Sequence, residues 1–108
     1  MRIDYKPLSV NECWKGRRFK TDEYKRYERS LLFMLPKYSL PLKPFAVSLV
    51  FGLSTLNADI DNPVKPLLDI LQKKYGFNDR DIMSLRVVKR KVEKGSEFIN
   101  FTIEHYLT

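Results

Sequence analysis

The segment NADIDNPVKPLLDIL, residues 57–71, connects an apolar stretch to an amphipathic helix and decides how the chain folds. Apolar residues recur in it at i, i+3, i+4 and i+7, which predicts a helix over residues 63–74. The pair Asn62-Pro63 is typical of an N-cap followed by a first helical position. Residues 45–53 are rich in β-branched and aromatic residues, which predicts a strand largely buried on both faces. The segment is thus expected to lead from a buried strand into a helix that packs on the sheet.

The rest of the chain supplies two further strands, a first helix and a short opening strand. The chain opens with a predicted strand over 2–5 and a polar and basic loop over 6–20. A helix over 22–35 follows, capped by Thr21 and ending before Pro36. Beyond Gly76, which ends the second helix, strands are predicted over 83–92 and 97–104, joined by a turn at 94–96. The order β-α-β-α-β-β predicts an α+β fold, a mixed sheet with both helices layered on one face.

Length and composition indicate a single domain over residues 1–108. A chain of this size with 44% hydrophobic residues can bury roughly 60 to 70% of its unfolded surface. The opening residues carry no apolar core of a signal peptide, and no run approaches the about 18 apolar residues that span a bilayer, so we expect a cytoplasmic protein without a membrane partner. Cys13 is the only cysteine and is interpreted as a spare thiol in a loop.

The charge balance favours a polyanionic partner. Twenty Lys and Arg residues against thirteen acids give a net charge of +7, and cations that neutralise phosphates release condensed counterions. Nucleic acid is the leading candidate, although excess charge also keeps a small domain soluble. The basic residues gather in two groups, Lys15, Arg17, Arg18, Lys20, Lys25 and Arg26 in the first and Arg86, Lys89, Arg90, Lys91 and Lys94 in the second.

Two acids stand directly before the second helix. If residues 58–61 are extended, Asp59 and Asp61 point to the same side. Two carboxylates 4 Å apart repel by about 4 kcal/mol at an effective dielectric constant near 20, unless a cation or a proton intervenes. A hard divalent ion such as Mg²⁺ would relieve this repulsion. The alternative is that both acids cap the helix and face solvent.

Other chemistries are excluded by the residues themselves. An EF-hand loop that began at Asp59 would need glycine and glutamate where the chain has Val64 and Ile70. His105 is the only histidine, so no Ser-His-Asp or Cys-His arrangement can be assembled. Metal-assisted phosphoryl chemistry is left as the main enzymatic option.

Lys65 lies four residues after Asp61 and four before Asp69, so the three side chains can share one flank of the helix. Such an arrangement can be a surface ion-pair ladder that contributes only a few tenths of a kcal/mol. Alternatively, an ammonium beside a metal cluster can bind a phosphate or stabilise the charge that forms on it.

The spacing of these residues resembles the signature of the RusA-like Holliday junction resolvases, small homodimeric endonucleases common in phages and prophages. The basic stretch KGRRFKT, residues 15–21, is also similar to the amino-terminal segment of that family. The residues that carry the resemblance are Asp59, Asp61, Asn62, Lys65, Asp69, Leu71, Asn78, Asp79 and Ile82.

The resemblance implies a role for each matched residue. Asp59, Asp61 and Asp79 would bind Mg²⁺ or Mn²⁺. Lys65 would be the catalytic lysine, and Asp69 would have a supporting role.

Two asparagines complete the comparison with the family. Members often carry two acids where this chain has Asn78-Asp79, so metal binding would be weaker if the first acid were the true ligand. Asn62 keeps an oxygen ligand but is interpreted as the helix cap, with a supporting role at most.

The implied function is a metal-dependent, structure-selective endodeoxyribonuclease that resolves four-way DNA junctions by paired symmetric nicks in recombination and repair. A homodimer with twofold symmetry matches the approximate symmetry of such a junction. The alternative is a DNA-binding accessory protein of phage origin that does not cut.

The basic groups are the candidate DNA contacts. Trp14 can stack on an unpaired base or, equally, fasten its loop to the core. The strand cations can contact phosphates or simply solvate a strand edge. The predicted DNA-binding residues are Trp14, Lys15, Arg17, Arg18, Lys20, Arg86, Lys89 and Arg90.

Overall fold

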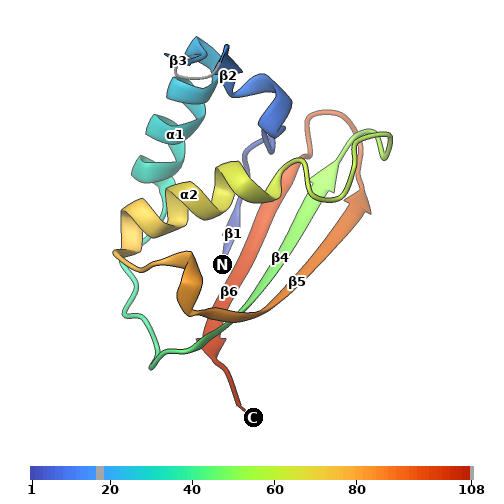
Figure 1. Cartoon of the computed structure of the whole chain (residues 1–108). Coiled ribbons are helices and arrows are strands. Elements are labelled where there is room, and N and C mark those ends of the chain that lie inside the picture. The colour runs from blue at the N-terminus through green and yellow to red at the C-terminus, as the bar shows by residue number, and fades with distance from the viewer. Residues whose placement is uncertain (17–18, 108) are drawn as a thin grey trace.

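A computed structural model describes residues 1–16 and 19–107 as a compact α+β fold, as predicted (Figure 1). The main sheet has the strand order β1-β6-β4-β5. It is mixed because β4 runs parallel to β5 and antiparallel to β6. Its strands are β1 (Arg2–Ile3), β4 (Phe45–Leu53), β5 (Ile82–Lys91) and β6 (Phe98–His105). Both α-helices lie on one face of this sheet (Figure 1).

The central strand β4 has two different faces. Its core-facing side chains are Phe45, Val47, Leu49 and Phe51, all nearly inaccessible to solvent. The intervening residues Ser48 and Val50 are only half-buried. The prediction that this strand is buried on both faces is therefore wrong for one of them, because both helices pack on the same side.

Helix α1 (Asp22–Met34) begins and ends as its sequence predicts. The Thr21 hydroxyl accepts a hydrogen bond from the backbone N–H of Tyr24 at 3.1 Å, which satisfies one of the unpaired donors of the first turn. Tyr24, Tyr27 and Leu31 form the buried stripe of this helix. Helix α1 therefore packs on the sheet through one face.

Helix α2 (Val64–Tyr75) ends at Gly76, which adopts the left-handed conformation with φ 72°. Its start differs from the expectation that Asn62 caps it. Pro63 occupies the N-cap position, and within the described chain no side chain caps the first turn. Asn62 instead contributes its backbone oxygen, which accepts a hydrogen bond from Val10 N at 2.8 Å. The N-terminal segment is thereby fastened to the start of α2.

Residues 6–20 are more structured than the predicted loop. They contain a 3₁₀ helix, η1 (Val10–Glu12), and a small antiparallel ribbon formed by β2 (Trp14–Lys15) and β3 (Phe19–Lys20). Cys13 lies in the bend between the two as a free thiol, and its side chain is fully buried. Burial raises the pKa of this thiol to about 11, with a further contribution from the charges of Glu12 and Asp69.

Strands β5 and β6 follow each other in the chain but are not neighbours in the sheet, because β4 lies between them. β4, α2 and β5 form a parallel crossover unit, which places β5 at one edge. A second 3₁₀ helix, η2 (Asp79–Asp81), leads into β5. Over residues 1–16 and 19–107, none of the helices has the length and apolarity to cross a bilayer.

Candidate functional site

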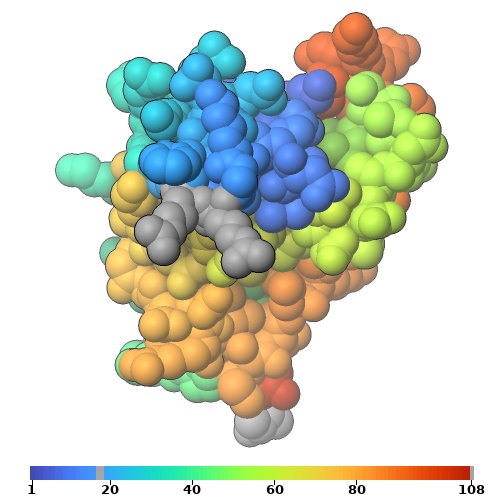
Figure 2. Space-filling model, turned by 45° about the horizontal axis from the view of Figure 1, so that its top comes forward, coloured from blue at the N-terminus to red at the C-terminus, as the bar shows by residue number. Residues whose placement is uncertain are grey.

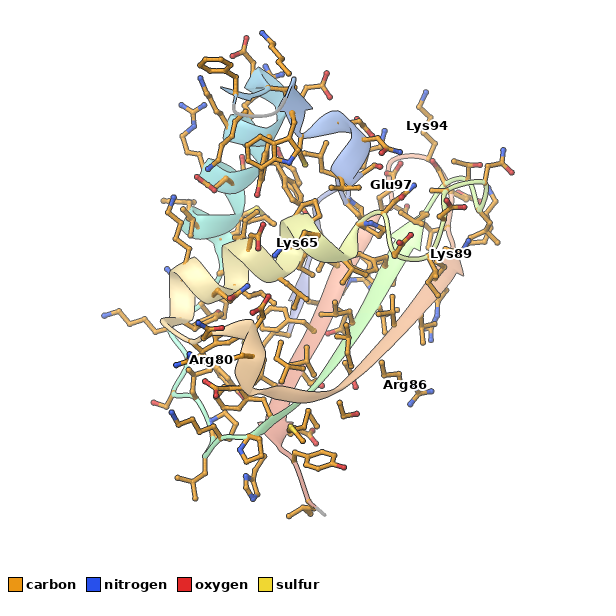
Figure 3. All side chains as sticks on the ribbon, viewed as in Figure 1. Lys65, Arg80, Arg86, Lys89, Lys94 and Glu97 are labelled. Atoms are coloured by element: carbon orange, nitrogen blue, oxygen red, sulfur yellow. The ribbon has the colours of Figure 1, made fainter. Side chains whose placement is uncertain are left out.

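Helix α2 and η2 bring three charged residues together. The ammonium Nζ of Lys65 lies 2.9 Å from Oδ1 of Asp69, one turn along α2, and 3.8 Å from Oδ2 of Asp79. The hydrogen bond to Asp69 and the negative charge of that carboxylate raise the pKa of Lys65, and Asp79 adds to the effect despite partial desolvation. Lys65 is therefore a charged ammonium throughout the neutral range. Figure 3 shows its side chain on α2.

Gln72 positions the backbone of Asp79 and was missed by sequence reasoning. Its Oε1 accepts a hydrogen bond from the Asp79 N–H at 2.9 Å, while its Nε2 donates to the carbonyl oxygen of Leu68 at 3.1 Å. Lys65, Asp69 and Gln72 stand at i, i+4 and i+7, so the helical period alone could have placed them on one face. What the period could not reveal is the residue that this face contacts.

The side chain of Asn78 has a structural role. Its Oδ1 accepts a hydrogen bond from Arg80 N at 3.0 Å and so caps η2. This amide oxygen is thus already engaged in the turn that presents Asp79.

Asp59 and Asp61 lie in consecutive turns and not in extended backbone. Asn62 N donates to the carbonyl oxygen of Asp59, and Val64 N donates to that of Asp61, both at 3.1 Å. The period-two argument for a shared direction of the two carboxylates therefore does not apply. Both residues are exposed at the N-terminal end of α2, whereas Asp79 follows its C-terminal end.

Within the described residues, Asp59, Asp61 and Asp79 are not gathered into one group. Among the residues that the structure describes, no group of three or more His, Cys, Asp or Glu side chains is arranged to hold an ion. Asp79 contacts Lys65, so an ammonium supplies its counter-charge here. A site built from Asp59, Asp61 and Asp79 would require the turn at 59–62 and η2 to approach each other.

Lys89 holds the loop that carries the acidic turn. Its ammonium donates to the carbonyl oxygens of Ala58 at 2.8 Å and of Leu56 at 3.1 Å, and Lys91 donates to that of Ser54. In the structure this ammonium binds loop carbonyl oxygens, and the phosphate contact of Lys89 stays a prediction. In Figure 3 Arg86 extends from β5 away from α2, and the sheet register places Arg90 on the same sheet face as Arg86.

The N-terminal DNA-contact candidates belong to the β2–β3 ribbon. Trp14 packs edge-on against Tyr24, with ring centroids 5.7 Å apart, and keeps 43% of its surface exposed. Lys20 is paired with Glu28 at 3.1 Å. Lys15 is exposed on the outer side of the ribbon. The two remaining candidates, Arg17 and Arg18, lie outside the described residues.

Three parts of the N-terminal and middle chain share one side of the molecule. In Figure 2 the N-terminal segment, in blue, lies between α1, in cyan, and the 54–63 loop, in yellow-green, with the orange η2 region below. The hydrogen bond from Val10 N to Asn62 O joins the N-terminal segment to the 54–63 loop. The N-terminal segment is therefore held beside the start of α2, the helix that carries Lys65.

Comparison of the chain with models of known protein families and with curated proteins found no match.

Proposed function

We propose that this protein is a divalent-metal-dependent endodeoxyribonuclease that nicks four-way DNA junctions. The observation that carries the proposal is that two carboxylates from different elements, those of Asp69 and Asp79, lie within salt-bridge distance of the Lys65 ammonium. All three belong to the pattern that resembles the RusA-like resolvases. A net charge of +7 suits a DNA partner.

Lys65 would act through its charge. Because the contact with Asp69 raises its pKa, Lys65 is protonated at neutral pH and is a poor general base. An ammonium in this position would bind a non-bridging oxygen of the scissile phosphate and stabilise negative charge as it develops. Asp69 would keep Lys65 charged and aimed toward η2, which is a positioning role.

Asp59, Asp61 and Asp79 would hold the ion once their two segments approach. Asp59 and Asp61 lie in turns, and Asp79 lies in the short 3₁₀ helix η2. Such connections change conformation more readily than the helices and strands that they join. A bound Mg²⁺ or Mn²⁺ would activate water and stabilise the leaving oxygen. The repulsion among these carboxylates is the reason that a cation is needed to assemble them.

A homodimer is part of the proposal, and the edge of the sheet supports it. β5 is ten residues long, and its outer edge has no strand partner within the described residues. It exposes the side chains of Met83 and Leu85. A long edge strand with exposed apolar residues is a surface that a second chain can cover.

The test is cleavage of a synthetic four-way junction with each strand end-labelled in turn. Mg²⁺ is expected to support paired nicks on strands of like polarity. Chelation by EDTA, or the substitution Asp61→Asn, is expected to abolish the nicks while junction binding persists. The matched control is Glu93→Gln, which removes an exposed carboxylate between β5 and β6. Nicking that continues in EDTA would reject the metal chemistry.

A second candidate is a junction-binding protein that does not cut. The arrangement of the acids favours it, because in the described part of the chain the three aspartates are not gathered into an ion-binding group. This candidate predicts tight junction binding with no nicks in either Mg²⁺ or Mn²⁺, and equal binding by the wild type and Asp61→Asn.

A further inference from the structure

The β2–β3 ribbon presents two different faces. The register pairs Trp14 with Lys20 and Lys15 with Phe19, and cross-strand partners lie on the same face of a ribbon. Trp14 and Lys20 face the protein, where the indole edge meets Tyr24 and the Lys20 ammonium lies 5.2 Å from the centroid of the same ring. Lys15 and Phe19 therefore form the outward face.

Phe19 is an exposed aromatic residue with a cation beside it. Its side chain is 72% exposed, although a phenylalanine is among the residues most often buried. Lys15 is its direct cross-strand neighbour. Phe19 and Lys15 also line an open groove of about 570 Å³ that continues to Trp14, Lys20 and Lys25. An exposed ring next to ammonium groups matches a base with its phosphates, since stacking and charge neutralisation act together in single-strand binding.

The ribbon lies close to the proposed catalytic cluster. Glu28 on α1 pairs with Lys20 of the ribbon and with Lys73 of α2, both at 3.1 Å. One carboxylate thus joins the ribbon to the helix that carries Lys65. A nucleotide held on the outer face would belong to the same DNA molecule as a phosphate at Lys65.

We propose that Phe19, flanked by Lys15, is a stacking contact for an unpaired or unstacked nucleotide of branched DNA. This inference rests on the proposed action on DNA. It adds a contact through which the protein would distinguish a branch point from unbranched duplex DNA. In duplex DNA the bases are stacked on each other and have no free face for Phe19. At a branch point a base can leave its stack at lower cost. Trp14 has a supporting role, because its ring packs against Tyr24 on the inner face of the ribbon.

The test measures binding of the full chain to a four-way junction and to a duplex of the same arm sequence, with 2-aminopurine at the branch point. Phe19→Ala is expected to weaken junction binding by roughly 5- to 150-fold and to change duplex binding little. It should also reduce the quenching of 2-aminopurine, and Phe19→Trp should restore both. Phe33→Ala is the matched control, because Phe33 is 89% exposed near the C-terminal end of α1 and should have no effect.

The salt dependence of DNA binding distinguishes the role of Lys15 from that of Phe19. Lys15→Ala is expected to lower the slope of log K against log salt by about 1, whereas Phe19→Ala should leave that slope unchanged. Equal losses for Phe19→Ala on junction and duplex, or wild-type quenching by Phe19→Ala, would overturn the stacking role. So would a shift from dimer to monomer in Phe19→Ala, because the ring would then be a contact between copies of the chain.

Junction cleavage by the wild type is recorded in the same samples. If the wild type binds the junction through Phe19 but never nicks it, the stacking contact stands and the nuclease proposal fails. If Phe19→Ala retains wild-type affinity while the wild type nicks normally, the nuclease proposal stands and the stacking contact is rejected. If the wild type binds neither DNA, both proposals are overturned.

Discussion

The ammonium of Lys89 donates a hydrogen bond of 2.8 Å to the carbonyl oxygen of Ala58, the residue that precedes Asp59. A strand residue thereby fixes the loop that leads from β4 to the acidic turn. Lys89 also donates to Leu56, so one side chain satisfies two loop carbonyls. The lysine that sequence reasoning assigned to DNA has a structural use in placing Asp59.

Replacement of Lys89 tests this relationship. Lys89→Ala is expected to lower the free energy of unfolding by about 1 kcal/mol, because two loop carbonyls lose a charged donor. Amide hydrogen exchange over residues 54–63 should become faster. Lys94→Ala should change neither quantity. Unchanged exchange in the loop of Lys89→Ala would show that the loop is held by other contacts.

Gln72→Met is expected to release Asp79 from α2. The substitution keeps the length of the side chain and removes the oxygen that accepts from the Asp79 N–H. We expect junction nicking to fall at least about tenfold while junction binding stays near the wild-type value, since a displaced catalytic group loses rate more than affinity. Gln72→Glu keeps an acceptor oxygen and should lose less activity. Equal activity of the wild type and Gln72→Met would remove Gln72 from the site.

Asp61→Asn separates a functional acid from a helix cap. Since Asp61 is exposed and α2 has no side-chain cap within the described chain, we expect the free energy of unfolding without added metal to change by no more than about 0.5 kcal/mol. A loss near 1 kcal/mol in thermal denaturation would instead support the capping interpretation.

Cys13 predicts a stability loss at alkaline pH. Burial raises the pKa of this thiol from 9.0 to about 11, so the folded state keeps the thiol neutral where the unfolded chain ionises it. The stabilisation is complete below pH 9 and is lost as the pH rises toward 11. Cys13→Ala should therefore show a flatter decline of melting temperature over this window than the wild type. Identical slopes would mean that the thiol does not ionise differently in the two states.

Gly52→Ala is expected to destabilise the sheet. The ring of Phe98 on β6 covers Gly52 on β4, and an added methyl group would overlap that ring. The guanidinium of Arg2, on β1, lies 4.1 Å from the centre of the Phe98 ring. A shift of Phe98 would therefore disturb three strands. We expect a loss of about 2 kcal/mol in denaturant unfolding, typical of overpacking. Ala46→Gly, on the same face of β4, should have a smaller effect.

Much of the fold follows from local patterns. The apolar stripe of residues 63–74, the glycine at position 76 and the Thr21 cap are short-range signals, and the corresponding helices lie within one residue of their predicted bounds. The strand over 45–53 matches β4. These features depend on backbone sterics and side-chain periodicity, which neighbouring residues determine by themselves.

The N-terminal ribbon was missed because its strands have two residues each, too few for a period to show. The contacts of Asp79 with Lys65 and Gln72 could not be predicted from the sequence either, because Asp79 lies beyond the end of the helix that carries the other two residues. The helical spacing placed Lys65 and Asp69 on one face, and only the return of the chain through η2 showed what that face meets.

The sequence by itself determined the two α-helices, the longer strands, the charge of the molecule and the residues that share a helix face, since these properties need only near neighbours along the chain. The tertiary structure alone decided that β4 separates β5 from β6, that Lys89 binds loop carbonyls and that Phe19 faces outward. Those outcomes depend on how the sheet register and the α2 crossover bring distant segments together, and a hydrogen bond or an exposed ring exists only after that packing is complete.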